Sequence, residues 1–204
     1  MNNVKPKKII IATRNNHKLY EIIQVMADLN LEILSLKDFP GLPDIKETGK
    51  TFNENALLKA NAVYHQTGFW SIADDSGLEV SALNGQPGIY SARYAGPNKD
   101  IKENNEKLLR NMIKIPFEKR GAQFYCAAAI AGPEITETVE GIVKGKISTE
   151  PRGTNGFGYD PLFIPEGFDQ TLGELDEEIK NNISHRAIAF KKMSKLLKTY
   201  ISKS

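Results

Sequence analysis

Short apolar runs rich in β-branched residues alternate along this chain with segments whose apolar residues recur at helical spacing. The run 7–13 precedes a helical segment at 19–27, and the run 69–73 follows a second helical segment that begins at a capping box of Thr51 and Glu54. Strands that alternate with helices in this way indicate an α/β fold.

Two longer segments with the pattern of strands, 123–131 and 136–147, meet at a Gly-Pro turn and favour a β-hairpin. A hairpin next to crossover units predicts a mixed sheet rather than a wholly parallel one. No repeat or linker interrupts the chain, and its 204 residues are enough for one sizeable core. We therefore expect a single domain over residues 1–204, whose last helix begins near Ser184.

The charge balance limits the partners that the protein can attract. The chain carries 27 basic and 25 acidic residues, a formal net charge of +2, which is too small to draw nucleic acid or an anionic membrane to the surface. The single cysteine, Cys126, permits neither an intrachain disulfide nor a Cys-based zinc site and is expected in the core. No apolar run approaches the roughly 18 residues of a membrane span. A reducing cytoplasm is the expected location.

A polar segment follows the first apolar run, where a strand is expected to turn into a helix. Backbone N–H groups and the helix dipole attract anions there, and a lysine on the first turn can hold a phosphate oxygen. The glycines of a Walker loop or a dinucleotide fingerprint are missing. The pattern predicts an anion site or, alternatively, an Asn cap followed by a solvated lysine. Its residues are Thr13, Arg14, Asn15, Asn16, His17 and Lys18.

The run 69–73 leads directly into Asp74, Asp75, Ser76 and Gly77, where we expect the strand to end. Neighbouring strand residues point to opposite faces, so only one of the two carboxylates can serve a given metal well. A carboxylate at a strand's end can hold Mg²⁺ or orient a water molecule. The alternative interpretation is an ordinary Asp-Ser-Gly turn.

Two later segments carry residues suited to binding a flat, polar ligand. The glycine-rich loop 153–160 offers Phe157 and Tyr159 for stacking and Asp160 for a base edge, although simple turn chemistry explains the same pattern. His185 and Arg186, at the start of the last helix, can bond a base carbonyl and a phosphate, or can merely belong to a helix cap.

Six blocks that carry these residues occur in a fixed order over nearly the whole chain. Together they resemble the inosine triphosphate pyrophosphatase family, the non-canonical purine NTP pyrophosphatases. The blocks are Thr13-x-Asn15-x-x-Lys18-x-x-Glu21, Glu47-Thr48-Gly49-x-Thr51-Phe52-x-Glu54-Asn55-Ala56, Ala73-Asp74-Asp75-Ser76-Gly77-Leu78, Pro87-Gly88-Ile89-Tyr90-Ser91-Ala92-Arg93-Tyr94, Gly156-Phe157-Gly158-Tyr159-Asp160-Pro161 and Ser184-His185-Arg186.

The resemblance implies an elongated two-lobed α/β fold around a central mixed sheet with flanking helices, a substrate cleft between the lobes, and a homodimer. It implies Mg²⁺-dependent hydrolysis of ITP, dITP or XTP to the monophosphate and pyrophosphate. Asp75 corresponds to the catalytic base and magnesium ligand. Many relatives have Glu-Glu where this chain has Lys46-Glu47. Glu47 is the expected second ligand because it is the one carboxylate at that place. The implied substrate-binding residues are Thr13, Arg14, Asn15, Asn16, His17, Lys18, Ser76, Phe157, Gly158, Tyr159, Asp160, Lys180, His185 and Arg186.

Two alternatives stay open from the sequence. A pyrophosphatase of modified pyrimidine nucleotides, similar to the Maf-like enzymes, would share the fold, but its Ser-x-Ser-Pro-Arg-Arg opening is absent. A non-enzymatic nucleotide-binding or nucleic-acid-binding module would use the lysine-rich face at 191–198. The near-zero net charge and the lack of a combined basic and aromatic motif argue against that module.

Overall fold

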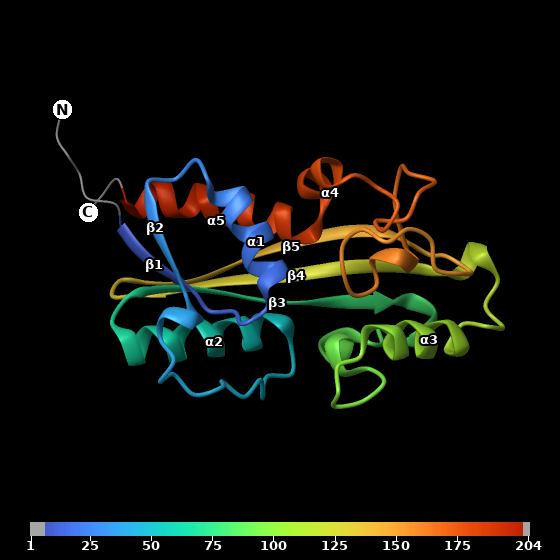
Figure 1. Cartoon of the computed structure of the whole chain (residues 1–204), viewed down its shortest axis with the longest axis horizontal. Coiled ribbons are helices and arrows are strands. Elements are labelled where there is room, and N and C mark those ends of the chain that lie inside the picture. Colours follow the sequence, from blue (N-terminus) through green and yellow to red (C-terminus); the bar gives the residue numbers. More distant parts are fainter. Residues whose placement is uncertain (1–6, 202–204) are drawn as a thin grey trace. The chain divides into compact units, whose positions relative to one another are not determined.

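The computed structural model describes residues 7–201 of the chain. Between those limits, strands and helices alternate as expected up to residue 132, and further strands and then two helices follow (Figure 1). The elements are β1 (Lys7–Ile11), α1 (Asn16–Met26), β2 (Leu31–Ser35), α2 (Phe52–Thr67), β3 (Trp70–Val80), α3 (Ile101–Asn111), β4 (Gly121–Gly132), β5 (Ile135–Ile147), β6 (Phe163–Pro165), α4 (Glu177–Ile183) and α5 (His185–Ile201).

The strands form one sheet in the order β2-β1-β3-β4-β5-β6. β1 runs parallel to both β2 and β3, with Ile9 opposite Ile33 on one side and Trp70 on the other. β6 runs antiparallel to β5. The sheet is therefore mixed and carries flanking helices, which confirms the predicted α/β class. The two lobes and the cleft implied by the family resemblance stay predictions.

The described residues divide into two compact units, which we describe separately. The first unit comprises the described residues up to Asp75, those from 126 to 141, and those from Arg186 onward. The second comprises residues 76–125 and 142–185. β3, β4 and β5 each contribute residues to both units.

In the first unit, α1 and α5 cover one face of the sheet and α2 covers the other (Figure 1). Alternate residues of the strands meet the α1 and α5 side, where Ile9, Ile72 and Cys126 pack with Met26 and Phe190. Burial raises the pKa of the Cys126 thiol to about 12, so this side chain stays protonated, as expected of a core cysteine. Both sides of β3 are thus covered by helices at this end of the sheet.

In the second unit, α3 lies against one face of the long strands (Figure 1). Leu108 and Met112 at its C-terminal end are completely buried beside Leu78, Phe124 and other core side chains. Asp100 caps α3 by accepting a hydrogen bond from the N–H of Glu103. Thr51 caps α2 in the same way, and Gly68 ends α2 in a left-handed conformation.

The prediction that the strand ends at Asp74 is wrong. β3 continues through Asp74 and Asp75 to Val80, and both carboxylates are buried within it. A charged side chain tolerates burial when it gains ionic or hydrogen-bonding partners, and both residues have them. The sequence analysis also missed α4, a short helix whose predominantly polar sequence lacks an apolar stripe.

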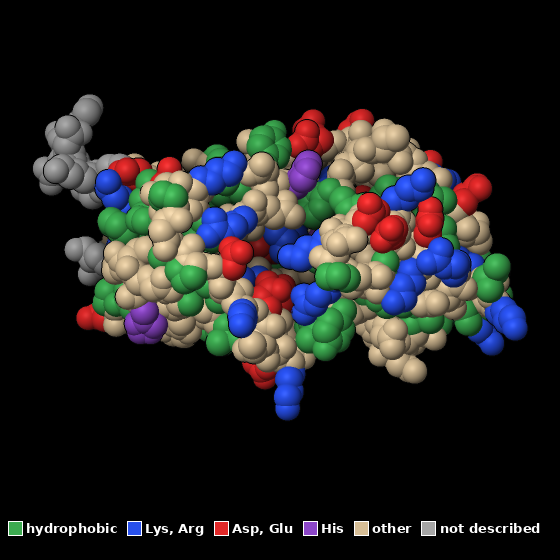
Figure 2. Space-filling model, turned by 60° about the horizontal axis from the view of Figure 1, so that its bottom comes forward, with side chains coloured by type: hydrophobic (Ala, Val, Ile, Leu, Met, Phe, Trp, Pro, Cys, Tyr) green, Lys and Arg blue, Asp and Glu red, His purple; other side chains and the backbone are tan. Residues whose placement is uncertain are grey.

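Among residues 7–201, no helix combines the length and the apolar character that crossing a membrane requires. Figure 2 shows basic and acidic side chains interspersed over the visible face, in keeping with the small formal net charge of +2.

Candidate active site

The two consecutive carboxylates of β3 face opposite sides of the sheet. Asp74 lies on the side of α1 and α5, where its Oδ2 accepts a hydrogen bond from Lys18 Nζ at 2.9 Å. Asp75 lies on the side of α2, where its Oδ2 accepts a hydrogen bond from Asn55 Nδ2 at 3.0 Å. The alternation of the strand gives each carboxylate its own set of partners.

Asp74 belongs to a buried ionic network. Arg186 Nε lies 3.4 Å from Asp74 Oδ2, while Arg186 Nη1 donates to Glu21 of α1. Burial alone would raise the pKa of Asp74, but Lys18 and Arg186 hold that pKa well below its usual range. Burial opposes the charge of Arg186 as well, and Asp74 and Glu21 outweigh it, so the pKa of the guanidinium is raised. Asp74 and Arg186 are therefore both charged at neutral pH.

Asp75 has a less strongly cationic environment. Lys59, one turn after Asn55 on α2, places its Nζ 3.5 Å from Asp75 Oδ1 and 2.7 Å from Glu47 Oε1. Asn55 also accepts a hydrogen bond from the N–H of Gly49 at 2.8 Å, which attaches the loop of Glu47 to α2. Burial raises the pKa of Asp75, and Lys59 only partly opposes this effect.

The turn between β1 and α1 has the geometry of a capped helix start. The Asn15 side chain accepts hydrogen bonds from the N–H groups of His17 and Lys18, and Thr13 Oγ1 accepts one from the N–H of Asn15. Arg14 bonds to Asp44 at 2.8 Å. The Asn cap expected from the sequence is confirmed, whereas the lysine on the first turn bonds to Asp74 instead of only to solvent.

In the second unit, the glycine-rich loop is held by one buried carboxylate. Asp160 Oδ2 accepts hydrogen bonds from the N–H of Phe157 and from Lys180 Nζ, both at 2.8 Å. Lys180 Nζ also lies 5.1 Å from the centre of the Phe157 ring, within cation–π range. Gly156 has φ +76°, and a Cβ there would meet Asp160 Oδ2 at 2.1 Å, so only glycine fits.

Three other predicted residues of the second unit are also fixed in place. Tyr159 donates its hydroxyl to the carbonyl of Ser91 at 2.9 Å, and burial raises the pKa of this phenol. The carbonyl of Gly158 accepts a hydrogen bond from Asn105. His185 is buried and stacks on Phe124 with ring centres 4.7 Å apart.

The predicted residues are divided between the two units. The first-unit set comprises Thr13, Arg14, Asn15, Asn16, His17, Lys18, Glu47, Asp75 and Arg186. The second-unit set comprises Ser76, Phe157, Gly158, Tyr159, Asp160, Lys180 and His185.

Sequence reasoning missed the roles of Lys59, Asn55 and Glu21 in these contacts. Two signals were available, because Asn55 and Lys59 are four residues apart on one helix, and Glu21 stands one turn after Lys18.

The first-unit set suits a hard divalent cation. Glu47 and Asp75 present oxygen donors, and an ammonium group already lies against both of them. Within residues 7–201, no three His, Cys, Asp or Glu side chains gather into a metal-binding group. Mg²⁺ typically uses one or two protein carboxylates and completes its shell with water and substrate phosphates. Asp75 and Glu47 therefore fit Mg²⁺ better than a metal that needs a full protein cage.

A family model matches most of the chain. It is the model of the Ham1 family, and it matches residues 9–196. The chain belongs to the Ham1 family.

Curated relatives are similar over almost their whole length. A dITP/XTP pyrophosphatase of Bacillus licheniformis is 50% identical over 94% of this chain and 98% of its own. A dITP/XTP pyrophosphatase of Listeria monocytogenes is 50% identical over 96% of this chain and 97% of its own.

Solved structures of Ham1 proteins have the same fold. The Ham1 protein of Staphylococcus aureus matches with a TM-score of 0.87 and 42% identity, over 95% of this chain and 100% of that one. A nucleoside-triphosphatase, or dITP/XTP pyrophosphatase, of Mycobacterium abscessus matches with a TM-score of 0.77 and 44% identity, over 93% of this chain and 98% of that one.

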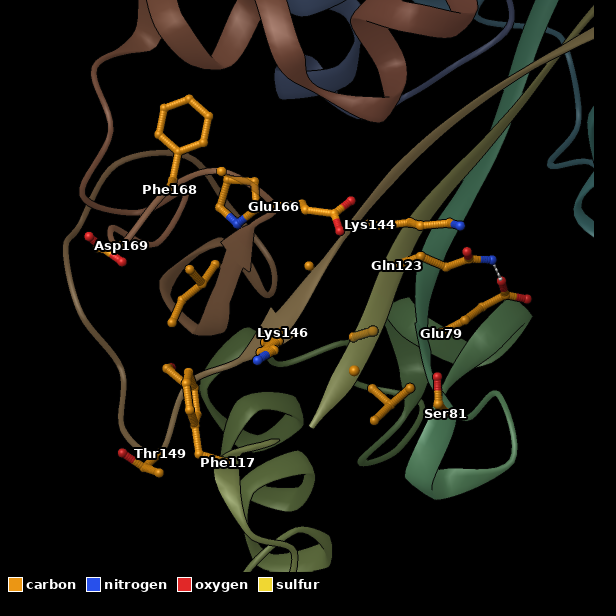
Figure 3. A pocket seen from close by; sticks show the side chains of 18 of the residues that line it. Glu79, Ser81, Phe117, Gln123, Lys144, Lys146, Thr149, Glu166, Phe168 and Asp169 are labelled. Atoms are coloured by element: carbon orange, nitrogen blue, oxygen red, sulfur yellow. Dashed lines mark hydrogen bonds between the residues drawn. The ribbon is translucent and has the colours of Figure 1, made fainter. Parts of the chain in front are cut away.

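A groove of about 1220 Å³ lies in the second unit, away from the predicted residues of that unit (Figure 3). Glu79, Gln123 and Lys144 line it from the neighbouring strands β3, β4 and β5, and Gln123 donates to Glu79 at 2.7 Å. None of the predicted site residues is among its lining residues. The groove therefore contributes none of the residues on which the candidate chemistry depends.

Proposed function

We propose that this Ham1 family member hydrolyses the non-canonical purine nucleotides dITP, XTP and ITP to the monophosphate and pyrophosphate. The observation that carries the proposal is the 50% identity to dITP/XTP pyrophosphatases over nearly the full length of both chains. The relatives' names do not favour the two alternatives, a pyrophosphatase of modified pyrimidine nucleotides and a binding module without activity.

Asp75 is the proposed general base. Its pKa is raised by burial, which makes the carboxylate a better proton acceptor than an exposed aspartate. In the proposed reaction, Asp75 accepts a proton from water as the water oxygen bonds to the α-phosphorus. The bond between the α-phosphorus and the bridging oxygen breaks, and that oxygen leaves with the β- and γ-phosphates as pyrophosphate. Asn55 fixes the orientation of the carboxylate during this step.

Asp75 and Glu47 are the proposed ligands of Mg²⁺. When bound, the ion neutralises charge on the triphosphate oxygens and so supplies the electrostatic part of the catalysis. Both carboxylates already bind the ammonium of Lys59, which supports their suitability for a cation.

The start of α1 is the proposed phosphate site. Thr13 to Lys18 place two cationic side chains, Arg14 and Lys18, at a helix N-terminus, where the helix dipole favours an anion. Lys18 uses one N–H bond for Asp74, and an ammonium group has three, so Lys18 can also hold a phosphate oxygen. Ser76, directly after Asp75, is the expected neighbour of the substrate on β3.

The second-unit residues are the proposed base-binding group. Phe157 supplies aromatic surface, whereas Tyr159 is packed in the core of the second unit. The bonds of Asp160 to Lys180 and to the Phe157 N–H keep the loop in one shape. Donors directed at the 6-oxo group, with no acceptor for an exocyclic amine, would favour hypoxanthine and xanthine steeply. His185 and Arg186 remain the predicted polar contacts, and a loop N–H is a further candidate donor.

The proposal is tested by pyrophosphate release from ITP, dITP, XTP, GTP, ATP and UTP, with Mg²⁺ and with EDTA. We expect release from the first three with Mg²⁺ and none with EDTA. The Asp75→Asn protein, purified in the same way, controls for contaminating phosphohydrolases. Equal release from UTP and ITP, or activity that survives EDTA, would contradict the proposed specificity or the proposed metal.

Two properties implied by the family stay predictions. We expect a homodimer, which light scattering of the purified protein checks directly. We also expect a cytoplasmic location, which fractionation of cells that produce the protein checks.

A further inference from the structure

One cation lies where the proposed metal would bind. Lys59 Nζ is 2.7 Å from Glu47 Oε1 and 3.5 Å from Asp75 Oδ1, and its side chain is only 13% exposed. Both contacted oxygens belong to the two carboxylates proposed as metal ligands. A single ammonium group thus lies against both carboxylates that a divalent cation would use and offsets part of their combined charge.

We infer that Lys59 is a resident cation of this site, which holds Glu47 and Asp75 together without metal and is displaced from them when Mg²⁺ binds. This inference rests on the proposed function for the identity of the metal ligands. Two adjacent carboxylates repel one another unless a positive charge lies near both, and a lysine reaching from a fixed helix supplies it. Metal and ammonium compete for the same oxygens.

The surroundings of Lys59 favour such an exchange. Asn55, four residues earlier on α2, bonds to Asp75 and to the Gly49 N–H, so Asp75 and the backbone of the Glu47 loop stay attached to α2 while the Lys59 ammonium moves. Burial lowers the pKa of Lys59, but Asp75, Asp74 and Glu47 together raise it, so the side chain stays a cation. Lysine also has a long, flexible stem, which lets its ammonium move while the helix stays fixed.

The exchange has a consequence for substrate binding. Once displaced, the Lys59 ammonium needs a new anionic partner, and a triphosphate oxygen is one. Metal binding without nucleotide is then weak, because it leaves this charge partly buried and poorly paired. The site would therefore take up metal and nucleotide together.

The test is Mn²⁺ binding to the nucleotide-free, full-length protein, measured from the electron paramagnetic resonance signal of the free ion. Lys59→Met removes the charge and keeps the stem, and we expect it to bind Mn²⁺ more tightly by on the order of tenfold. Lys59→Arg keeps a cation and should stay close to the wild type. Lys59→Gln is the second neutral variant if the Met protein does not fold.

Two matched controls separate competition from a general change in charge. Lys18→Met removes a cation that is bonded to Asp74 instead of Asp75, and it should tighten Mn²⁺ binding much less. Lys195→Met removes an exposed charge from α5 and should change nothing. An equal gain in Lys18→Met and Lys59→Met would overturn the inference, as would an unchanged or weaker affinity in Lys59→Met, or no Mn²⁺ binding by any variant.

Thermal unfolding gives a second readout. Without Lys59, the repelling carboxylates should lower the melting temperature in EDTA, and Mn²⁺ should raise it more in Lys59→Met than in the wild type. An equal rise of the melting temperature on addition of Mn²⁺ in the wild type and in Lys59→Met would overturn the inference. If the wild type releases pyrophosphate but Lys59→Met gains no affinity for Mn²⁺, only this inference is contradicted. If Lys59→Met gains affinity for Mn²⁺ but the wild type is inactive on every nucleotide, only the proposed function is contradicted.

Discussion

Asp74 and Asp75 are consecutive residues of one strand, yet their surroundings drive their pKa values in opposite directions. Asp74 meets two cations, Lys18 and Arg186, which hold its pKa well below the usual range in spite of burial. Asp75 meets Lys59 and a neutral amide, and burial raises its pKa. The period of two in a β-strand is sufficient to give two identical side chains different chemistry.

The difference suggests a division of labour between the two faces of β3. A carboxylate with a depressed pKa stays charged and stabilises the cations around it, whereas one with a raised pKa accepts protons more readily. Asp74 therefore belongs to the architecture that positions Lys18 and Arg186, and Asp75 is the carboxylate that we propose for the reaction. Variants that remove each charge separately test this division of labour.

The largest expected effect is on activity. Asp75→Asn removes the proposed base and one metal ligand, and turnover of dITP should fall by on the order of 10²–10⁴-fold, the range typical of a lost general base. The measurement is single-turnover pyrophosphate release with saturating Mg²⁺. Circular dichroism of the same preparation should show an intact fold. Activity within about threefold of the wild type would exclude Asp75 as the base.

The next effect is on stability. Asp74→Asn leaves Lys18 and Arg186 without their shared carboxylate, and breaking a buried ionic network in this way costs about 3–5 kcal/mol of unfolding free energy. Urea unfolding at pH 7 measures it. The contribution of Asp74 is present above its unfolded pKa, about 3.9, and is lost as the pH falls through its lower folded pKa.

The pH dependence of the unfolding free energy at acidic pH gives the prediction for Asp74→Asn a second check. As the pH falls below about 4, the unfolding free energy of the wild type should decrease more steeply than that of Asp74→Asn, because only the wild type has this carboxylate to protonate. Parallel losses in the two proteins would mean that the depressed pKa of Asp74 does not contribute to stability.

A smaller effect should follow from the amide beside Asp75. Asn55→Asp keeps an acceptor for the Gly49 N–H but places a second carboxylate against Asp75, where an amide donated before. We expect kcat/KM to fall by about 10–100-fold, as for other supports of metal ligands. The acidic limb of its pH profile should move to higher pH, since a neighbouring negative charge raises the pKa of Asp75.

Asn53→Asp is the matched control for this variant. Asn53 lies on the same helix and donates to Glu140 at 2.6 Å, away from Asp75. Its replacement adds the same charge and should lower stability, but it should leave the acidic limb in place. A limb that moves equally in both variants would show that Asn55 has no specific positioning role.

The sequence predicted the fold class well because the fold depends on short-range patterns. Apolar runs and helical spacing define the strands and most helices, and caps such as Thr51 and Asp100 mark helix starts through local hydrogen bonds. The short helix α4 carries few apolar residues and was missed. The course of β3 was mistaken because acidic residues in a strand are tolerated only through partners distant in sequence.

The same limit applies to the candidate site. Family motifs contained Lys18, Asp75 and Arg186, and the alternation of a strand predicted that the two aspartates face opposite ways. The bond from Arg186 to Glu21 joins residues 165 positions apart, and no local pattern predicts such a pair. Lys59 was overlooked for a related reason, since a lysine on an amphipathic helix usually faces solvent.

The smallest expected effect is on stability, and its sign is opposite to that expected for Asp74→Asn. A carboxyl with a raised folded pKa contributes stability that is present below its unfolded pKa and is lost as the pH rises through the folded pKa, so ionised Asp75 costs stability at neutral pH. Asp75→Asn, which resembles the protonated form, should therefore melt slightly above the wild type at pH 7 in EDTA. The difference should shrink as the pH falls through the folded pKa of Asp75. A lower melting temperature at pH 7 would mean that the contact of Asp75 with Lys59 outweighs its burial, and the two faces of β3 would then differ in degree rather than in sign.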